Sequence, residues 1–282
     1  MKYPTIRGCM ALCTTLVGMW LGCGAQGPLE PPLVASLDFA DPALDAAVRR
    51  ALQKPIGPIL PADVVGLTWF SAAGQGIVSL NGIEKLSSLT SLVLSSNRIE
   101  DIGPLARLPN LELLYLDNNR IVDISTLSNM TALTVLDVSG NRIERIAALS
   151  SVTVLKMFQC NNNRIVDISA LSKLSSLEIL HLRGNRIVDI SALSNLTLLN
   201  TLSLRDNLIA DIAVLSRLTR LNQLGLSNNQ ISDLTALINN PGLNDFDTLE
   251  LSGNPLSKTA LTIQIPVLEA RRVAVFLVSL NG

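Results

Sequence analysis

The stretch from Leu111 to Ala132 reads LELLYLDNNRIVDISTLSNMTA, and this 22-residue phrase recurs along most of the chain. Each copy has the form LxxLxLxxNxIxxIxxLxxLxx with small variations, and a ninth copy begins at Phe246 after a slip of three residues. The first eight copies open at Leu67, Leu89, Leu111, Leu133, Leu155, Leu177, Leu199 and Leu221. Self-similarity at a fixed period of this length is typical of a solenoid, whose copies stack on one another.

The opening of each copy predicts a short strand, because its leucines alternate. Leu114 and Leu116 lie two residues apart and therefore on one face of a strand, which Asn119 ends. The later apolar residues, Ile121 to Met130, recur at spacings of three, which suits tight 3₁₀-like or irregular turns. One copy cannot bury these side chains alone, so stacking predicts a continuous apolar core and a parallel sheet with strands about 4.8 Å apart.

An asparagine recurs at one position of the repeat and predicts a structural ladder. Its members are Asn97, Asn119, Asn141, Asn163, Asn185, Asn207, Asn229 and Asn254. A buried amide both donates and accepts hydrogen bonds, so it can satisfy backbone groups where the chain turns and between neighbouring coils. The first copy has Gln75 in this place, which we interpret as an end effect because terminal repeats are usually atypical.

The two ends of the array carry signals for capping elements. Asp41 and Pro42 are a typical helix start, with Asp as the N-cap and Pro at the first helical position. A second short helix is predicted from Pro61. Near the C-terminus, residues 259–270 predict a short helix or irregular packing, and residues 273–278 predict a final edge strand.

The repeat, these caps and the ending Asn254-Pro255-Leu256 resemble internalin-like bacterial leucine-rich repeat proteins, over Asp38 to roughly Val278. The resemblance implies an α/β leucine-rich repeat solenoid: a right-handed coil with a parallel concave β-sheet, a convex side of 3₁₀ or irregular turns, a helical N-terminal cap and a strand-containing C-terminal cap. That family contains adhesins and binding proteins whose ligands are read by exposed strand positions. The expected domains are a signal peptide (1–22), a flexible tether (23–37), an N-terminal cap (38–66), nine repeats (67–256) and a C-terminal cap (257–282).

The first 25 residues look like a targeting segment, in which the basic residues Lys2 and Arg7 precede an apolar run over residues 9–22. That run is too short for a comfortable membrane span and suits a signal peptide. The sequence WLGC, which ends at Cys23, resembles a bacterial lipobox, although Trp stands where Leu is usual. We favour a membrane-anchored lipoprotein acylated at Cys23, and the alternative is a secreted protein cleaved after Ala25.

Composition and motifs exclude several classes of function. The net charge of −1 gives no electrostatic case for nucleic acid. No phosphate-binding glycine loop, zinc-ligand cluster or His-Glu-x-x-His motif occurs, so no cofactor or metal is expected. Alternation places Cys160 inward and His181, the only histidine, outward, which excludes a Cys–His dyad. A hydrolase that uses His181 with Ser203 is the least favoured alternative, because Asp137 lies two strands away.

The outward strand positions are the candidate ligand contacts. The third place of four consecutive copies holds Leu113, Val135, Met157 and Ile179; the fifth place holds Tyr115, Asp137, Gln159 and His181; Arg183 and Arg205 border the C-terminal side. An apolar stripe with a polar rim suggests a protein-binding surface. Two alternatives stay open: neighbouring strands shield these side chains from one another, or Trp69 and the polar residues bind carbohydrate or cell wall.

A row of arginines follows the asparagine ladder, and a row of aspartates lies three residues further on. They are Arg98, Arg120, Arg142, Arg164 and Arg186, with Asp101, Asp123, Asp167 and Asp189. We expect exposed ion pairs worth about 0–1 kcal/mol each; an anion-binding row is the alternative, although the aspartates cancel most of its field. The whole sequence predicts a monomeric, non-catalytic, extracytoplasmic module that binds a protein or surface partner through the concave sheet.

Overall fold

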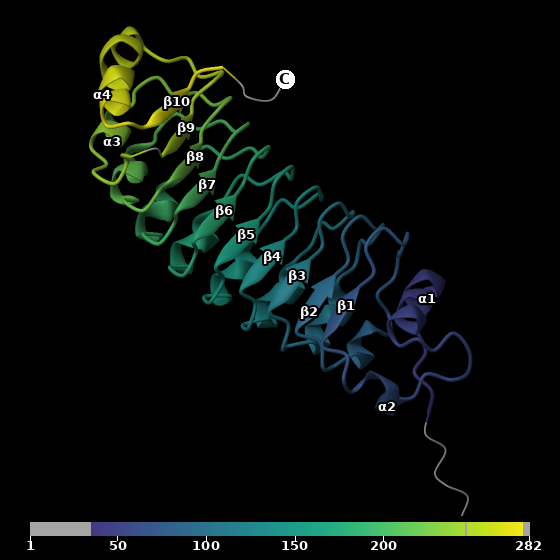
Figure 1. Ribbon diagram of the computed structural model, residues 1–282. Helices are drawn as coiled ribbons and strands as arrows, with labels where there is room; N and C mark the ends of the chain where they lie inside the picture. The colour runs from purple at the N-terminus through teal and green to yellow at the C-terminus, as the bar shows by residue number, and fades with distance from the viewer. Residues whose placement is uncertain (1–34, 246, 279–282) are drawn as a thin grey trace, which may run out of the picture. The chain divides into compact units, whose positions relative to one another are not determined.

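Ten short parallel strands lie side by side in one sheet, in the order in which they occur in the chain (Figure 1). The computed structural model describes residues 35–245 and 247–278, and these ten strands lie within that range. They are β1 (Trp69–Ser71), β2 (Ser91–Val93), β3 (Leu113–Tyr115), β4 (Val135–Asp137), β5 (Met157–Gln159), β6 (Ile179–His181), β7 (Thr201–Ser203), β8 (Gln223–Gly225), β9 (Thr248–Glu250) and β10 (Ala274–Phe276). The predicted signal peptide, Cys23 and Phe246, the expected start of the ninth copy, lie outside the described residues.

The middle residue of each repeat strand points into the core. In β4, Leu136 is fully buried, whereas Val135 and Asp137 are half-buried on the opposite face. Val135 pairs with Leu113 on β3 and with Met157 on β5, so equivalent residues of successive copies lie in register. The alternation of leucines therefore predicted both the strands and the direction of their side chains.

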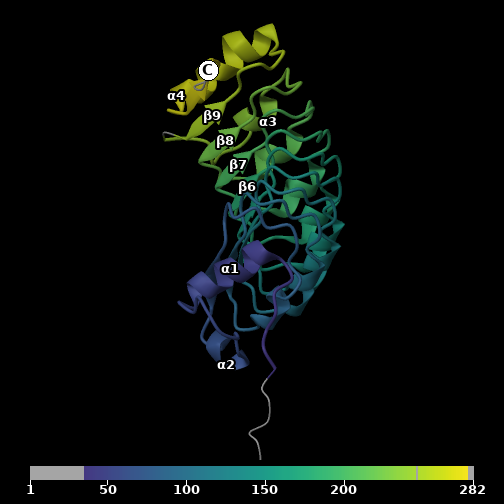
Figure 2. The ribbon, with the colours of Figure 1, turned by 90° about the vertical axis from the view of Figure 1, so that its right-hand side faces the viewer.

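Short 3₁₀ helices on the opposite side of the coil return the chain from one strand to the next (Figure 2). They are η1 (Ile83–Lys85), η2 (Gly103–Arg107), η3 (Ser125–Asn129), η4 (Ala147–Ser151), η5 (Ser169–Lys173), η6 (Ser191–Asn195) and η7 (Ala213–Arg217). Around η3, Ile121, Ile124, Leu127 and Met130 are all buried. The spacing of three is thus confirmed as 3₁₀ geometry, and these side chains join the strand leucines in one continuous hydrophobic core.

The repeated asparagines form the ladder that the sequence predicts. Nδ2 of Asn119 donates to the carbonyl oxygens of Leu116 in its own coil and Leu94 in the preceding coil, both at 3.0 Å. Its Oδ1 accepts a hydrogen bond from the backbone N–H of Ile99 at 3.0 Å. The same contacts recur at the neighbouring asparagines. Each buried amide therefore satisfies backbone groups of two coils and ties them together.

The residue before each ladder asparagine has a left-handed backbone conformation. Asn118 has a φ of 55°, and Gly140, its equivalent one coil later, has a φ of 67°. A Cβ on Gly140 would lie 2.6 Å from Oδ1 of Asn118, so this site also lacks room for a side chain. Glycine and asparagine tolerate such φ values, which accounts for the GN and NN pairs of the repeat.

Helices α1 (Pro42–Ala51) and α2 (Pro61–Val64) precede β1, as predicted. One oxygen of Asp41 caps α1 by accepting hydrogen bonds from the N–H groups of Ala43 and Leu44. The other oxygen accepts from the N–H groups of Val78 and Ser79 in the first coil, at 2.7 and 3.0 Å. Burial raises the pKa of Asp41, but these four hydrogen bonds outweigh it and lower the pKa below its ordinary value. The ionised carboxylate therefore fastens α1 to the repeats.

At the other end, α3 (Thr235–Ile238), η8 (Ala260–Gln264) and α4 (Ile265–Ala270) lead to β10, which pairs with β9. The predicted helix and final strand are both present, although η8 is a wider π-helical turn. Gln264 accepts a hydrogen bond from the N–H of Leu234 at 2.8 Å and donates to Asp233 at 2.7 Å. These contacts fasten the C-terminal helices to the eighth coil.

The aspartates that follow the arginine row do not form the expected ion pairs. Oδ1 of Asp123 accepts a hydrogen bond from the N–H of Ser125 at 2.9 Å, at the start of η3. Asp101, Asp167 and Asp189 accept the equivalent hydrogen bond from the N–H two residues further on. None of these four has an ion-pair partner in the described part of the chain, and Arg120 reaches Glu100 of the preceding coil instead, at 3.8 Å. The expectation was wrong because the unpaired N–H groups at each helix start compete for the carboxylates.

Candidate functional site

The outward side of β3 to β6 brings together eight of the side chains that the sequence singled out. We call the outward side of the ten strands the sheet face. The apolar row consists of Leu113, Val135, Met157 and Ile179, paired strand by strand in register. The polar row consists of Tyr115, Asp137, Gln159 and His181, paired in the same way. The two rows therefore run parallel to each other across four adjacent strands.

The apolar row is half-buried rather than fully exposed. Its four side chains, like those of the polar row, have intermediate exposure because side chains on adjacent strands cover one another's flanks. Trp69 on β1 is 60% exposed, but the register places Ser91 of β2 between it and Leu113. Neighbouring strands therefore do shield the two rows in part, as one of the alternatives expected. Trp69 does not adjoin Tyr115.

Asp137 lies within the polar row, with Tyr115 and Gln159 beside it on the flanking strands. Oδ1 of Asp137 accepts a hydrogen bond from the backbone N–H of Ser139 at 2.9 Å. Burial raises the pKa of Asp137, which the bonds from Ser139 offset only in part. Burial also lowers the pKa of His181, and the charge of Asp137 opposes that change. Burial thus disfavours the charged form of both groups.

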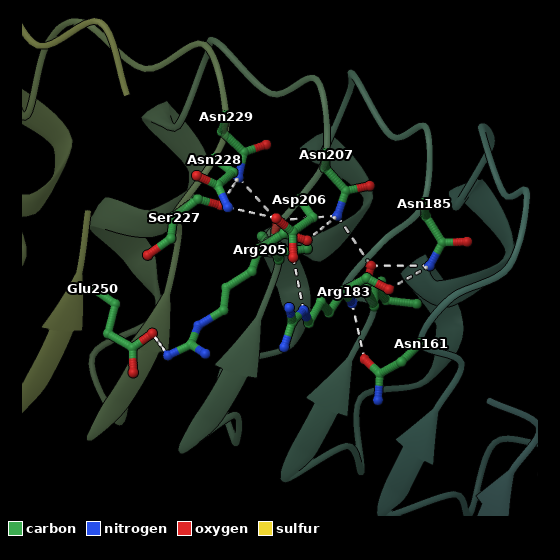
Figure 3. Close-up of polar contacts among 12 residues, drawn as sticks. Asn161, Arg183, Asn185, Arg205, Asp206, Asn207, Ser227, Asn228, Asn229 and Glu250 are labelled. Atoms are coloured by element: carbon green, nitrogen blue, oxygen red, sulfur yellow. Dashed lines mark hydrogen bonds and ion pairs between the residues drawn. The ribbon is translucent and has the colours of Figure 1, made fainter. Parts of the chain in front are cut away.

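Arg183 and Arg205, at the C-terminal side of the rows, each hold a carboxylate of this chain (Figure 3). Nε of Arg183 donates to Oδ2 of Asp206 at 2.7 Å, and Nδ2 of Asn228 donates to the other oxygen of Asp206 at 2.6 Å. The guanidinium of Arg205 pairs with Glu250, which lies two strands further along the sheet. The charges of this half of the sheet face are thus paired within the chain.

A hollow of about 290 Å³ lies over β6 to β9, lined by His181 and Arg183 among others, and at Gly225 the sheet face has no side chain. Gly225 stands in register between Ser203 and Glu250. A Cβ on Gly225 would lie 3.1 Å from Nε of Arg205, so the absence of a side chain lets Arg205 cross β8. Sequence reasoning missed Gly225 and Glu250, although a glycine inside a strand is a signal of close approach.

The residues of the hydrolase hypothesis do not form a catalytic arrangement. Ser203 is the register neighbour of His181, but no hydrogen bond joins their side chains in the described structure. Asp137 is separated from His181 by the strand that carries Gln159. Cys160 is fully buried on the core side, where burial raises the pKa of its thiol, so it is inert as a nucleophile.

Neither a membrane-spanning helix nor a metal-binding cluster occurs in residues 35–245 and 247–278. No helix there has both the length and the apolar character needed to cross a bilayer. No group of three or more His, Cys, Asp or Glu side chains in that range is arranged to hold a metal ion. Cys23, the predicted lipidation site, lies outside the described residues.

Family comparison agrees with the coil geometry. The leucine rich repeat family model matches residues 87–143, and the model of two leucine rich repeat copies matches residues 153–195 and 197–239. The register, the 3₁₀ turns and the asparagine ladder extend the same coil beyond the matched residues. The chain is a leucine-rich repeat protein.

Among its relatives, Internalin H of Listeria monocytogenes is 33% identical over 73 residues, which are 25% of this chain and 13% of that protein. A crystal structure of an internalin C2 from Listeria monocytogenes shares 26% identity at a TM-score of 0.62, covering 85% of this chain and 94% of that one. A leucine-rich repeat protein of Leptospira interrogans shares the fold at 22% identity and a TM-score of 0.60, over 70% of this chain and 57% of that one. Within its family, this chain is internalin-like. Proteins of this type are protein-interaction modules and are typically non-catalytic.

Proposed function

We propose that this protein is a non-catalytic recognition module that binds a protein partner through the sheet face. The observation that carries the proposal is the apolar row, four aliphatic or thioether side chains in register on β3 to β6. Three intervals of about 4.8 Å make the row about 14 Å long, enough to receive several side chains of a partner. Tyr115 adds an amphipathic anchor beside the row. The remaining proposed contacts are Asp137, Gln159, His181, Arg183 and Arg205.

The experiment places a charge on the row and asks whether a partner is lost while the fold survives. Val135→Glu and Met157→Glu are each expected to abolish crosslinked capture of a specific protein from the native membrane. Unfolding free energy should change by less than about 1.5 kcal/mol, since the core leucines point the other way. Val166→Glu is the matched control, because Val166 is 55% exposed and lies off the sheet.

Three results would count against this function. Unchanged capture by both row variants would move the site off the sheet face. Unfolding of both would show that the row is core. Binding to a glycan array that survives Val135→Glu but is lost in a Trp69→Ala variant would favour the carbohydrate alternative. That alternative rests on Trp69, the one exposed aromatic side chain of the described sheet.

We propose that the module works outside the cytoplasm as a monomer, held to a membrane by a lipid on Cys23. The positive start and the apolar run over residues 9–22 support export, and the WLGC sequence supports acylation. In this proposal residues 23–37 are the tether, and residues 38–66 and 257–282 cap the repeats at 67–256. Mass spectrometry of the mature N-terminus decides the anchor: an acylated Cys23 is expected, and an unmodified chain beginning at Gln26 would indicate secretion instead. Sedimentation of the delipidated protein would test the monomer.

A further inference from the structure

Asp137 stands at the centre of the proposed binding face. It lies two residues from Val135 of the apolar row, and Tyr115 and Gln159 flank it on the adjacent strands. Among the described residues, only the N–H and hydroxyl groups of Ser139 donate to its carboxylate, and Oδ1 accepts the N–H at 2.9 Å. The carboxylate is therefore half-buried among side chains and keeps capacity for a further donor.

This carboxylate has no ion-pair partner among the described residues. No lysine, arginine or histidine forms an ion pair with Asp137 in that range. The two arginines of the sheet face are held by Asp206 and Glu250. His181, two strands away, attracts Asp137 when it is protonated, and a second carboxylate, Asp117, repels Asp137.

A partner that covers the apolar row must also remove water from Asp137, because the two rows adjoin. Burying an ionised carboxylate without an opposite charge is strongly unfavourable, whereas a paired and hydrogen-bonded one is tolerated. A positive charge from the partner would favour the ionised form and so oppose the burial that raises the pKa of this carboxyl. The missing positive charge has to come from the partner.

We propose that the partner presents a lysine or arginine side chain to Asp137, within an apolar segment that covers the row from Leu113 to Ile179. The inference rests on the proposed function and names the chemistry of its partner. The aliphatic stem of such a side chain can lie along Tyr115 and Val135 while its charged head reaches Asp137. A basic residue flanked by apolar residues thus matches both rows at once.

The experiment selects random peptides from a display library on the immobilised full-length protein. Selected peptides are sorted by whether Val135→Glu abolishes their binding. Among those that depend on the row, a lysine or arginine next to apolar residues is expected to be enriched. Asp137→Asn keeps the acceptor for Ser139 and removes the charge, and it should weaken these peptides at least tenfold. Asp137→Lys should select acidic peptides in place of basic ones.

The control variant is Glu178→Gln, which removes the same charge at an exposed residue just before β6, outside both rows. It should change peptide affinity by less than about twofold. Row-dependent peptides that show no basic preference and bind the Asp137→Asn variant normally would overturn this inference and leave the proposed function standing. An absence of any row-dependent peptide would overturn both.

Discussion

The core side and the outward side of the same strands differ in how strictly they repeat. At the core side, Leu136 and the ladder asparagine Asn141 have equivalents in almost every coil, and these side chains are buried except that of Asn254 in the last repeat, which is half-buried. On the sheet face, the fifth place changes from Tyr115 to Asp137 to Gln159 across three coils. Stacking demands the same side chain in each coil, whereas recognition of a partner does not. Repetition therefore identifies structural positions, and variation identifies candidates for binding.

The largest expected effect compares two neighbours on one strand. Leu136→Ala should lower the unfolding free energy by about 2–5 kcal/mol, because it opens a cavity in a fully buried site. Val135→Ala, one residue earlier on the half-buried outward side, should cost less than about 1.5 kcal/mol. Denaturant titration of both variants measures the difference, and equal midpoints would erase the distinction between the two sides of the sheet.

A smaller effect compares two neighbouring residues in the turn that follows β4. Asn141→Ala should cost about 1–3 kcal/mol, since it leaves the carbonyl groups of Leu116 and Val138 and the N–H of Ile121 without their amide partner. Arg142→Ala changes an exposed residue without an ion pair in the described structure and should cost well under 1 kcal/mol. Thermal or denaturant unfolding gives both values. Comparable losses would mean that the ladder amide is not what joins the coils.

The smallest effect concerns the charge of Asp137 in the unbound protein. Its pKa is raised in the folded state, so wild-type stability falls as pH rises from the unfolded value of 3.8 through the folded one. The Asp137→Asn variant escapes this loss. Relative to the wild type, the variant should therefore become more stable as pH rises above 3.8, by no more than about 0.5 kcal/mol because solvent screens a half-exposed group. A variant that loses stability over this range would show that Asp137 has a cationic partner in the folded chain.

Much of the fold follows from the repeat alone. The 22-residue period predicted the strands, which of their side chains point into the core, and the asparagine ladder, because the same local pattern occurs in every copy. The adjacency of Val135 and Met157 followed from the same period. The Arg–Asp pairs were predicted wrongly, since sequence spacing does not say whether Asp123 meets a guanidinium or a backbone N–H.

Tertiary structure alone decided the contacts that do not repeat. Arg205 and Glu250 are 45 residues apart, and they meet because a slip of three residues is absorbed before β9 and because Gly225 leaves space between them. Arg183 pairs with Asp206, and Asp137 has no ion-pair partner among the described residues. The sequence determined which residues face outward, since alternation and period are local properties of the backbone. Which of these residues form ion pairs depends on distances between coils, and only the stacked structure sets those distances.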